Sequence, residues 1–228
     1  MHDIRKMMPG FLTAVVLTLV FSILFTVYPE IDLYVSRLFY DAQEGFFLKK
    51  SSVVIFLYDS IEVFVPAFIF FCFAGLFFIR IRKKTYFGLG YAGILYLLIA
   101  LALGPGLIIN GILKEFWGRA RPSTVAEFGG KLDFTPALVP SDQCHSNCSF
   151  ASGHASAGFF PMALAFAFPR NKKKFLAAGI IYGCLAGFAR IAQGGHFFSD
   201  VVFAGLIVYL LSWLLRIFFD RLTGKAWE

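Results

Sequence analysis

The chain has 228 residues, a length typical of one domain, and its composition is not that of a water-soluble protein. Apolar residues make up 58% of it and charged residues only 15%, which leaves too little polar surface for a soluble domain of this size. In a soluble protein the net charge of +7 would suggest nucleic acid. Membrane proteins, however, carry extra Lys and Arg on their cytoplasmic loops, so we expect no nucleic-acid partner.

Six apolar stretches follow one another along the chain, separated by polar connections. A helix that crosses a bilayer needs about 20 mostly apolar residues, and only the fourth stretch is clearly shorter. The stretches are Gly10–Val27, Val53–Ile79, Phe87–Leu113, His154–Phe168, Phe175–Ala192 and Asp200–Phe219. No internal repeat or linker interrupts them. We therefore predict an all-α polytopic membrane protein, a single domain over residues 1–228 built as a bundle of six transmembrane helices.

The basic residues predict the orientation of this bundle. With a cytoplasmic amino terminus, thirteen of the 21 Lys and Arg lie on the inside, where membrane proteins concentrate them. The largest groups lie in Arg80–Lys84 and Arg170–Lys174. The first stretch has a basic start but no small-residue cleavage site after it, so we expect a retained helix rather than a signal peptide.

The segment Pro29–Lys50 then lies outside and alternates charged residues with aromatic and aliphatic ones. Two arrangements fit this pattern equally well. The segment lies along the membrane surface as an amphipathic piece, or it packs as a loop on the outer ends of the helices.

Three polar segments interrupt the apolar pattern at the predicted outer ends of the helices. They are Lys114–Pro122 after the third stretch, Phe150–Ala155 at the start of the fourth, and Ala189–Asp200 at the turn between the fifth and sixth. Although they are far apart in the sequence, they share one membrane depth in this topology. Grouped ionisable residues near a membrane are functional by default, so the pattern predicts one site.

Several residues of these segments suit a bound phosphate. Lys114, Arg121 and Arg190 can neutralise its oxygens, and Arg can do so through two parallel hydrogen bonds. Ser152 and Gly153 sit where a helix begins; free N–H groups there bind anions, and Gly permits close approach. Each residue alone has a plainer interpretation, as an interfacial anchor or a helix cap. Their number at one depth favours the anion site.

The two histidines of these segments are the groups there that exchange protons near neutral pH. Asp200 follows His196 by four residues, so on a helix it lies one turn along the same face. It can then accept a hydrogen bond from the imidazole and leave the other nitrogen free to attack. A helix-stabilising pair is the plainer interpretation of His196 and Asp200, and a structural helix-end residue is that of His154.

The same segments resemble the signature of the type 2 phosphatidic acid phosphatase superfamily. Its first motif is Lys, six residues and Arg-Pro, a spacing that Lys114–Pro122 retains. Its second, Pro-Ser-Gly-His, matches residues 151–154 except that Ala replaces Pro. Its third, Ser-Arg, five residues, His, three residues and Asp, matches residues 189–200 except that Ala replaces Ser. The three-part match is very specific.

The resemblance implies a role for each residue. His196 is similar to the nucleophile that becomes phosphorylated, Asp200 to its orienting partner, and His154 to the general acid that protonates the leaving oxygen. The phosphate-binding set is implied to be Lys114, Arg121, Ser152, Gly153 and Arg190. No metal and no cofactor are implied, and no carboxylate cluster of the kind that holds Mg²⁺ accompanies the motifs.

The surrounding residues resemble bacterial lipid A phosphatases, over Trp117–Pro122, Gln143–Phe150 and Gln193–Val201. This implies an enzyme of the bacterial inner membrane that removes the 1- or 4′-phosphate of lipid A at the periplasmic face. A phosphatidylglycerophosphate, phosphatidate or undecaprenyl diphosphate phosphatase would share the catalytic residues and is the alternative. The expected partners are the lipid phosphate and the membrane, and nothing in the pattern indicates an oligomeric state.

Two other classes of protein fit the composition or the motifs less well. A transporter usually places polar groups near the bilayer midplane, whereas these lie at helix ends. Related folds bind vanadate and oxidise halides, but a more soluble composition would favour that chemistry.

The cysteines divide into two pairs. Cys72 and Cys184 fall within apolar stretches and are expected to be reduced packing residues. Cys144 and Cys148 lie in the outer loop before Ser152, where an oxidising periplasm favours a disulfide over two free thiols. The pair with His145 lacks a usual zinc spacing.

Overall fold

The computed structural model describes residues 2–224, and side chains from Met8 to Gly224. Three of the thirteen basic residues that the predicted orientation assigns to the inside, Arg5, Lys6 and Lys225, therefore have side chains outside the described residues. The helices are α1 (His2–Val27), α2 (Glu30–Arg37), α3 (Ser52–Arg82), α4 (Tyr91–Leu101), α5 (Lys114–Phe116), α6 (Gly153–Phe159), α7 (Pro161–Ala167), α8 (Lys172–Ala192) and α9 (Phe198–Thr223). A π-helix, Ala102–Leu113, joins α4 to α5, and 3₁₀ turns cover Pro122–Thr124, Ala126–Phe128 and Pro169–Asn171.

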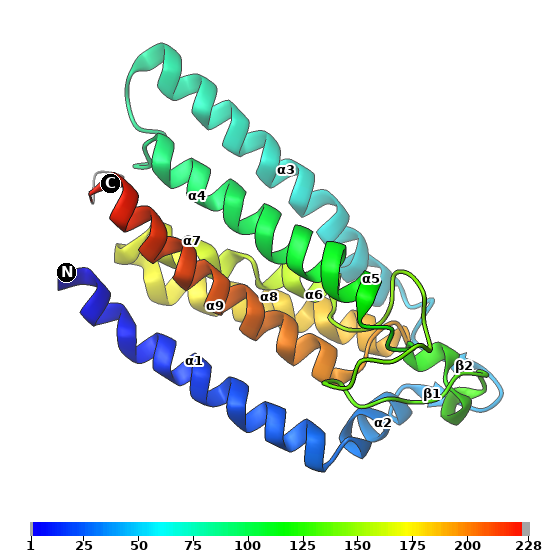
Figure 1. Cartoon of the computed structure of the whole chain (residues 1–228). Coiled ribbons are helices and arrows are strands. Elements are labelled where there is room, and N and C mark those ends of the chain that lie inside the picture. Colours follow the sequence, from blue (N-terminus) through cyan, green and yellow to red (C-terminus); the bar gives the residue numbers. More distant parts are fainter. Residues whose placement is uncertain (1, 225–228) are drawn as a thin grey trace.

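The long helices run side by side in one bundle (Figure 1). Five helical segments among the described residues are long and apolar enough to cross a membrane: Met8–Val27, Ser52–Arg82, Tyr91–Phe116, Pro169–Ala192 and Phe198–Thr223. This confirms a helical protein with several membrane-spanning segments. The predicted count of six is not confirmed, because the fourth stretch forms two short helices instead of one long one.

The break in the fourth stretch has a local cause. Pro161 has no backbone N–H and begins α7, so α6 ends at Phe159 and α7 starts afresh. The two short helices follow each other along the middle of the bundle, where both pack against α8 and α9 (Figure 1). Nearly all of their side chains are buried. A segment enclosed in this way needs less length and less hydrophobicity than a helix that faces lipid.

The outermost helices carry the apolar surface. On α1, residues such as Ile23 are 65% exposed, and on α3 Phe56 is 70% exposed. Large apolar side chains that remain exposed over whole helices are stable only against an apolar solvent. These faces therefore fit the acyl chains of a bilayer.

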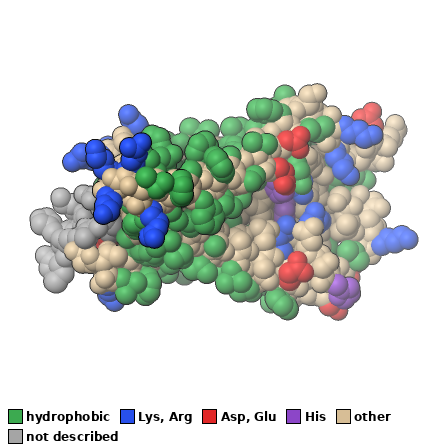
Figure 2. Space-filling model, turned by 90° about the horizontal axis from the view of Figure 1, so that it is seen from above, with side chains coloured by type: hydrophobic (Ala, Val, Ile, Leu, Met, Phe, Trp, Pro, Cys, Tyr) green, Lys and Arg blue, Asp and Glu red, His purple; other side chains and the backbone are tan. Residues whose placement is uncertain are grey.

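The two ends of the bundle differ in charge (Figure 2). One end carries the basic connections around Lys83 and Lys173, and both chain termini lie there (Figure 1). The opposite end carries mixed charges and the long connections: α2, a two-stranded hairpin of β1 (Tyr40–Asp41) and β2 (Gly45–Phe46), and the loop before α6 (Figure 1). In the hairpin Tyr40 pairs with Phe46 in antiparallel register. The segment Pro29–Lys50 thus packs as a folded cap that begins with α2.

Candidate functional site

The three polar segments meet at this capped end of the bundle. Backbone hydrogen bonds tie them together: the N–H of Ser152 donates to the carbonyl of Asp200 (3.2 Å), and that of Ser149 donates to the carbonyl of Arg119 (2.8 Å). The N–H of Cys148 donates to the carbonyl of Lys114 at 2.8 Å. The loop before α6 therefore joins the end of α5 to the start of α9, as the predicted common depth requires.

His196 lies in the turn between α8 and α9. Gly194 adopts a φ of +68°, which L side chains rarely adopt, so a Gly here lets α8 end and the chain reverse. His196 is fully buried, and its Nδ1 lies 2.7 Å from the carbonyl oxygen of Ser149. The buried Nε2 has no hydrogen-bond partner among the described residues. The ring is thus held at one nitrogen and left open at the other.

The electrostatic surroundings keep His196 neutral. Burial lowers the pKa of His196 to about 4; the Asp200 carboxylate opposes this, and Arg190 and Lys114 reinforce it. At neutral pH the imidazole is therefore uncharged, with the N–H on Nδ1 and a lone pair on Nε2. A neutral imidazole with a free lone pair can act as a nucleophile.

Asp200 is close to His196 but differs from the expected arrangement. Its Oδ2 lies 3.7 Å from His196 Nδ1, which is longer than a hydrogen bond, so the carbonyl of Ser149 takes the place expected for the carboxylate. The reason is that His196 precedes α9, which begins at Phe198, and that Asp200 has other partners. Its Oδ2 accepts from the Ser149 hydroxyl (2.6 Å) and from the Phe197 N–H (2.8 Å).

His154 stands at the start of α6, beside α3. Its Nε2 lies 3.1 Å from Oε1 of Glu62, and its ring stacks on Tyr58 with centroids 4.1 Å apart. Its side chain remains 18% exposed, in contrast to the buried His196. The sequence does not predict this contact, because nothing local pairs Glu62 with a histidine 92 residues later.

The three predicted cations gather around the histidines. Lys114, Arg121 and Arg190 all interact electrostatically with His154, and Lys114 and Arg190 also with His196. Arg121 donates from Nε and Nη2 to the carbonyl of Asn147, and Arg190 donates to the side chain of Gln193. In the described part of the chain the buried Nε of Arg190 has no partner, like Nε2 of His196. Unpaired buried donors and acceptors are costly, so they indicate a place for a ligand.

Ser152 and Gly153 begin α6. Ser152 is its N-cap, with Oγ accepting from the Ala155 N–H at 3.4 Å, and its own N–H already donates to Asp200. Gly153 lines a groove, together with Lys114 and His154.

This groove of about 540 Å³ leads from His154 into the apolar body of the bundle. Its polar end has Lys114, His154 and Glu62. Its other walls come from α3, α4, the π-helix and α6, and apart from Asn110 they are apolar: Ile61, Val65, Pro66, Ile69, Leu101, Ala102, Pro105, Gly106 and Ala157. The groove can therefore hold a molecule with a charged head and a hydrocarbon tail.

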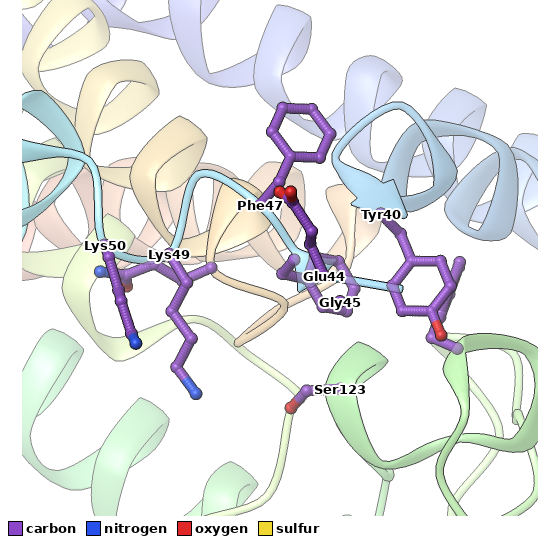
Figure 3. Close-up of a pocket in the computed structure, with 10 residues that line it drawn as sticks. Tyr40, Glu44, Gly45, Phe47, Lys49, Lys50 and Ser123 are labelled. Carbon is purple, nitrogen blue, oxygen red and sulfur yellow. The ribbon is translucent and has the colours of Figure 1, made fainter. Parts of the chain in front are cut away.

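A second hollow of about 450 Å³ lies under the hairpin cap (Figure 3). Lys49, Lys50, Tyr40 and Ser123 line it, but none of the predicted site residues does. Gln193 joins it to the site, since Gln193 also accepts from Arg190. The hollow is thus a neighbour of the site and not the place where the motifs converge.

The four cysteines are one bonded pair and two separate thiols. Cys144 and Cys148 are joined by a disulfide, and Cys72 and Cys184 are free thiols. Between Met8 and Gly224, no group of three or more His, Cys, Asp or Glu is placed to hold a metal ion.

The chain is similar to known proteins over most of its length. The model of the PAP2 superfamily matches residues 93–223. A lipid A 4′-phosphatase of Francisella tularensis subsp. novicida (strain U112) is 35% identical over 200 residues, covering 85% of this chain and 88% of the relative. The phosphatidylglycerophosphatase B of Bacillus subtilis (strain 168) is 30% identical over 158 residues, covering 65% and 64% of the two chains.

The fold also has a solved counterpart. The crystal structure of a transmembrane PAP2-type phosphatidylglycerolphosphate phosphatase from Bacillus subtilis is similar with a TM-score of 0.59, at 23% identity, over 93% of this chain and 98% of that one. Together these matches confirm the predicted family and the prediction of a membrane phosphatase of lipid phosphates. This chain, with its three motifs joined at one end of a helical bundle, belongs to the PAP2 superfamily.

Proposed function

We propose that this enzyme removes the 4′-phosphate of lipid A. The groove is the observation that supports a lipid substrate. Its polar end holds His154 and Lys114, while its apolar walls lie within the membrane-spanning helices. A phosphate bound there would have its hydrocarbon in the bilayer. The choice of lipid A and of its 4′-phosphate rests on the relative from Francisella, which spans most of both chains.

The chemistry follows from the two histidines. Nε2 of His196, buried and without a partner among the described atoms, attacks the phosphorus. The negative charge of the bound phosphate favours the protonated form of His154. As the new N–P bond forms, the bond from phosphorus to the lipid oxygen breaks, and this protonated His154 donates the proton that the oxygen needs. Water then attacks the phosphohistidine with His154 as base, which releases inorganic phosphate and restores both imidazoles. Asp200 orients the His196 turn rather than touching the substrate.

The remaining site residues bind the phosphate. Lys114, Arg121 and Arg190 neutralise its oxygens, with Ser152 and Gly153 shaping the approach at the start of α6. Cations preorganised where negative charge develops are the main source of rate in phosphoryl transfer. With this neutralisation supplied by side chains, we expect activity without a metal or cofactor.

The topology that goes with this function has six crossings in one domain over residues 1–228, with α6 and α7 together as the fourth. The apolar surface and the basic end support a bacterial inner-membrane protein with that end in the cytoplasm. The site, at the opposite end, then faces the periplasm.

Thiol labelling tests this orientation. With Cys72 and Cys184 replaced by Ala, a cysteine at Ser123 should react with an impermeant reagent in intact spheroplasts, because Ser123 is exposed at the site end. A cysteine at Thr85, exposed at the basic end, should react only after lysis. The reverse pattern would place the site in the cytoplasm.

Mass spectrometry of lipids tests the substrate. Expression in a bacterium whose lipid A keeps both phosphates should yield lipid A that has lost one phosphate, with fragment ions placing the loss at the 4′ position. Cells expressing His196→Ala are the control. Unchanged lipid A with depleted phosphatidylglycerophosphate would assign the enzyme to the glycerophospholipid alternative instead.

A further inference from the structure

Arg119 is a buried cation that the three motifs leave without a role. It is fully buried, and Gly118 before it has a φ of +70°, which turns the chain out of α5 and directs Arg119 into the interior. Its guanidinium lies 4.3 Å from the ring centroid of Phe197, the neighbour of His196. A charge buried so completely is stable only if its partners compensate the lost hydration.

These partners connect α2, the outer loop and α9. Nη2 donates to Oδ2 of Asp32 (2.8 Å), and Nη1 donates to Oδ1 of Asp200 (2.5 Å) and to the Ser199 hydroxyl (2.9 Å). Nε donates to the carbonyl of Thr135 at 2.9 Å. The two carboxylates outweigh the effect of burial and raise the pKa of Arg119, so the guanidinium stays charged.

The carboxylate of Asp32 is held as firmly as that of Asp200. Its Oδ1 accepts from the N–H of Ser199 (2.8 Å), and its Oδ2 accepts from the Ser199 hydroxyl and from Arg119. Burial raises the pKa of the Asp32 carboxyl, whereas the charge of Arg119 and the hydrogen bonds from Ser199 and Arg119 act in the opposite direction. Because all of these partners are donors, they favour the ionised carboxylate. Arg119 therefore bridges two buried anions, one in the cap and one beside the nucleophile.

A short path leads from this bridge to His196. Asp200, fixed by Arg119 at Oδ1, accepts the Ser149 hydroxyl at Oδ2, and the carbonyl of the same Ser149 holds Nδ1 of His196. The N–H of Ser149 donates to the carbonyl of Arg119 itself. The position and the tautomer of His196 thus depend on a closed network in which Arg119 takes part twice.

We infer that Arg119, anchored by Asp32, is a positioning residue that sets the geometry and the charge state of His196 through Asp200 and Ser149. This rests on the proposed role of His196 as the nucleophile. It also gives the cap segment a function, because α2 supplies the second carboxylate of the bridge. The substrate does not need to touch Arg119 for this effect.

Kinetics of Arg119→Lys test the positioning. Lys keeps the charge but cannot donate to both carboxylates in the same fork. With para-nitrophenyl phosphate and the purified full chain, we expect kcat to fall about 10²-fold, the cost of a small misplacement, while KM changes little. Arg216→Lys is the matched control, since Arg216 is also a buried, ion-paired Arg (Nε to Asp220 Oδ1, 2.9 Å) but lies near the other end of α9. It should keep the wild-type kcat.

The pH profile separates positioning from mere stability. His196 is faced by Asp200, Lys114, Arg190 and His154 in all these variants, so only the bridge changes. Arg119→Gln removes a positive charge and should move the acid limb of kcat to higher pH. Asp32→Asn removes a negative charge and should move it to lower pH. A loss of folded protein would lower the rate of both variants, but it would not shift the acid limb of their kcat profiles in opposite directions.

The outcomes are distinct. Wild-type kcat in Arg119→Lys, an equal loss in Arg216→Lys, or an acid limb that stays in place would each overturn the inference. If Arg119→Gln does not fold, the position of the acid limb in the kcat profile of Asp32→Asn decides whether the inference holds. If the wild-type chain releases no phosphate, or His196→Ala remains active, the proposed function itself fails, and the two failures are thereby told apart.

Discussion

Replacing His196 with Ala is expected to abolish phosphate release. The side chain supplies the attacking nitrogen, and loss of a covalent nucleophile in other hydrolases lowers kcat by about 10⁶-fold. His196 is fully buried, but its removal leaves Ser149 with one unpaired carbonyl in a loop that other hydrogen bonds hold, so the chain should still fold. Phosphate release from lipid A and from an aryl phosphate, measured on the purified variant, checks this.

The covalent intermediate gives a second measurement on the same residue. Acid quenching destroys phosphohistidine, so the wild-type enzyme is stopped with base, and the labelled peptide should contain His196. His145→Ala is the matched control, because it removes an exposed imidazole from the neighbouring loop and leaves the site unchanged. Substantial turnover by His196→Ala, or label on another residue, would remove His196 from the role of nucleophile.

Replacing His154 with Ala should have an effect that depends on the leaving group. General acid assistance typically raises the rate by about 10²–10⁴-fold. The sugar oxygen that leaves from lipid A is strongly basic, so its departure depends fully on this proton. An aryl oxide is a much weaker base and leaves with little help from a proton. We therefore expect a large loss of kcat for lipid A and a clearly smaller one for para-nitrophenyl phosphate.

The two substrates control for each other, because a general loss of folding would lower both rates equally. Equal losses on both, with the variant shown to be folded, would mean that His154 binds phosphate but does not donate the proton. Glu62, whose Oε1 lies 3.1 Å from Nε2 of His154, would then be the first residue to test as the proton source.

Much of this protein was predictable from the sequence because the signals are local. An apolar stretch of about 20 residues reports a membrane helix whatever lies around it. The motif spacings of Lys114 to Pro122 and of His196 to Asp200 are read within one segment each, and they led to the family that the comparisons confirm. The predicted count of six helices is not confirmed, because the signal is weakest at the short fourth stretch, which Pro161 divides.

The tertiary structure decided the partners of the charged residues, because these are chosen by packing between distant segments. Nothing near Asp32 indicates that it pairs with Arg119, 87 residues later, since the sequence around each is compatible with an exposed surface. The same holds for the carbonyl of Ser149, which accepts the hydrogen bond from Nδ1 of His196 that the four-residue spacing predicts for Asp200. Spacing along a chain determines which side chains can meet on one helix, whereas the low dielectric of a packed interior determines which charges must meet there.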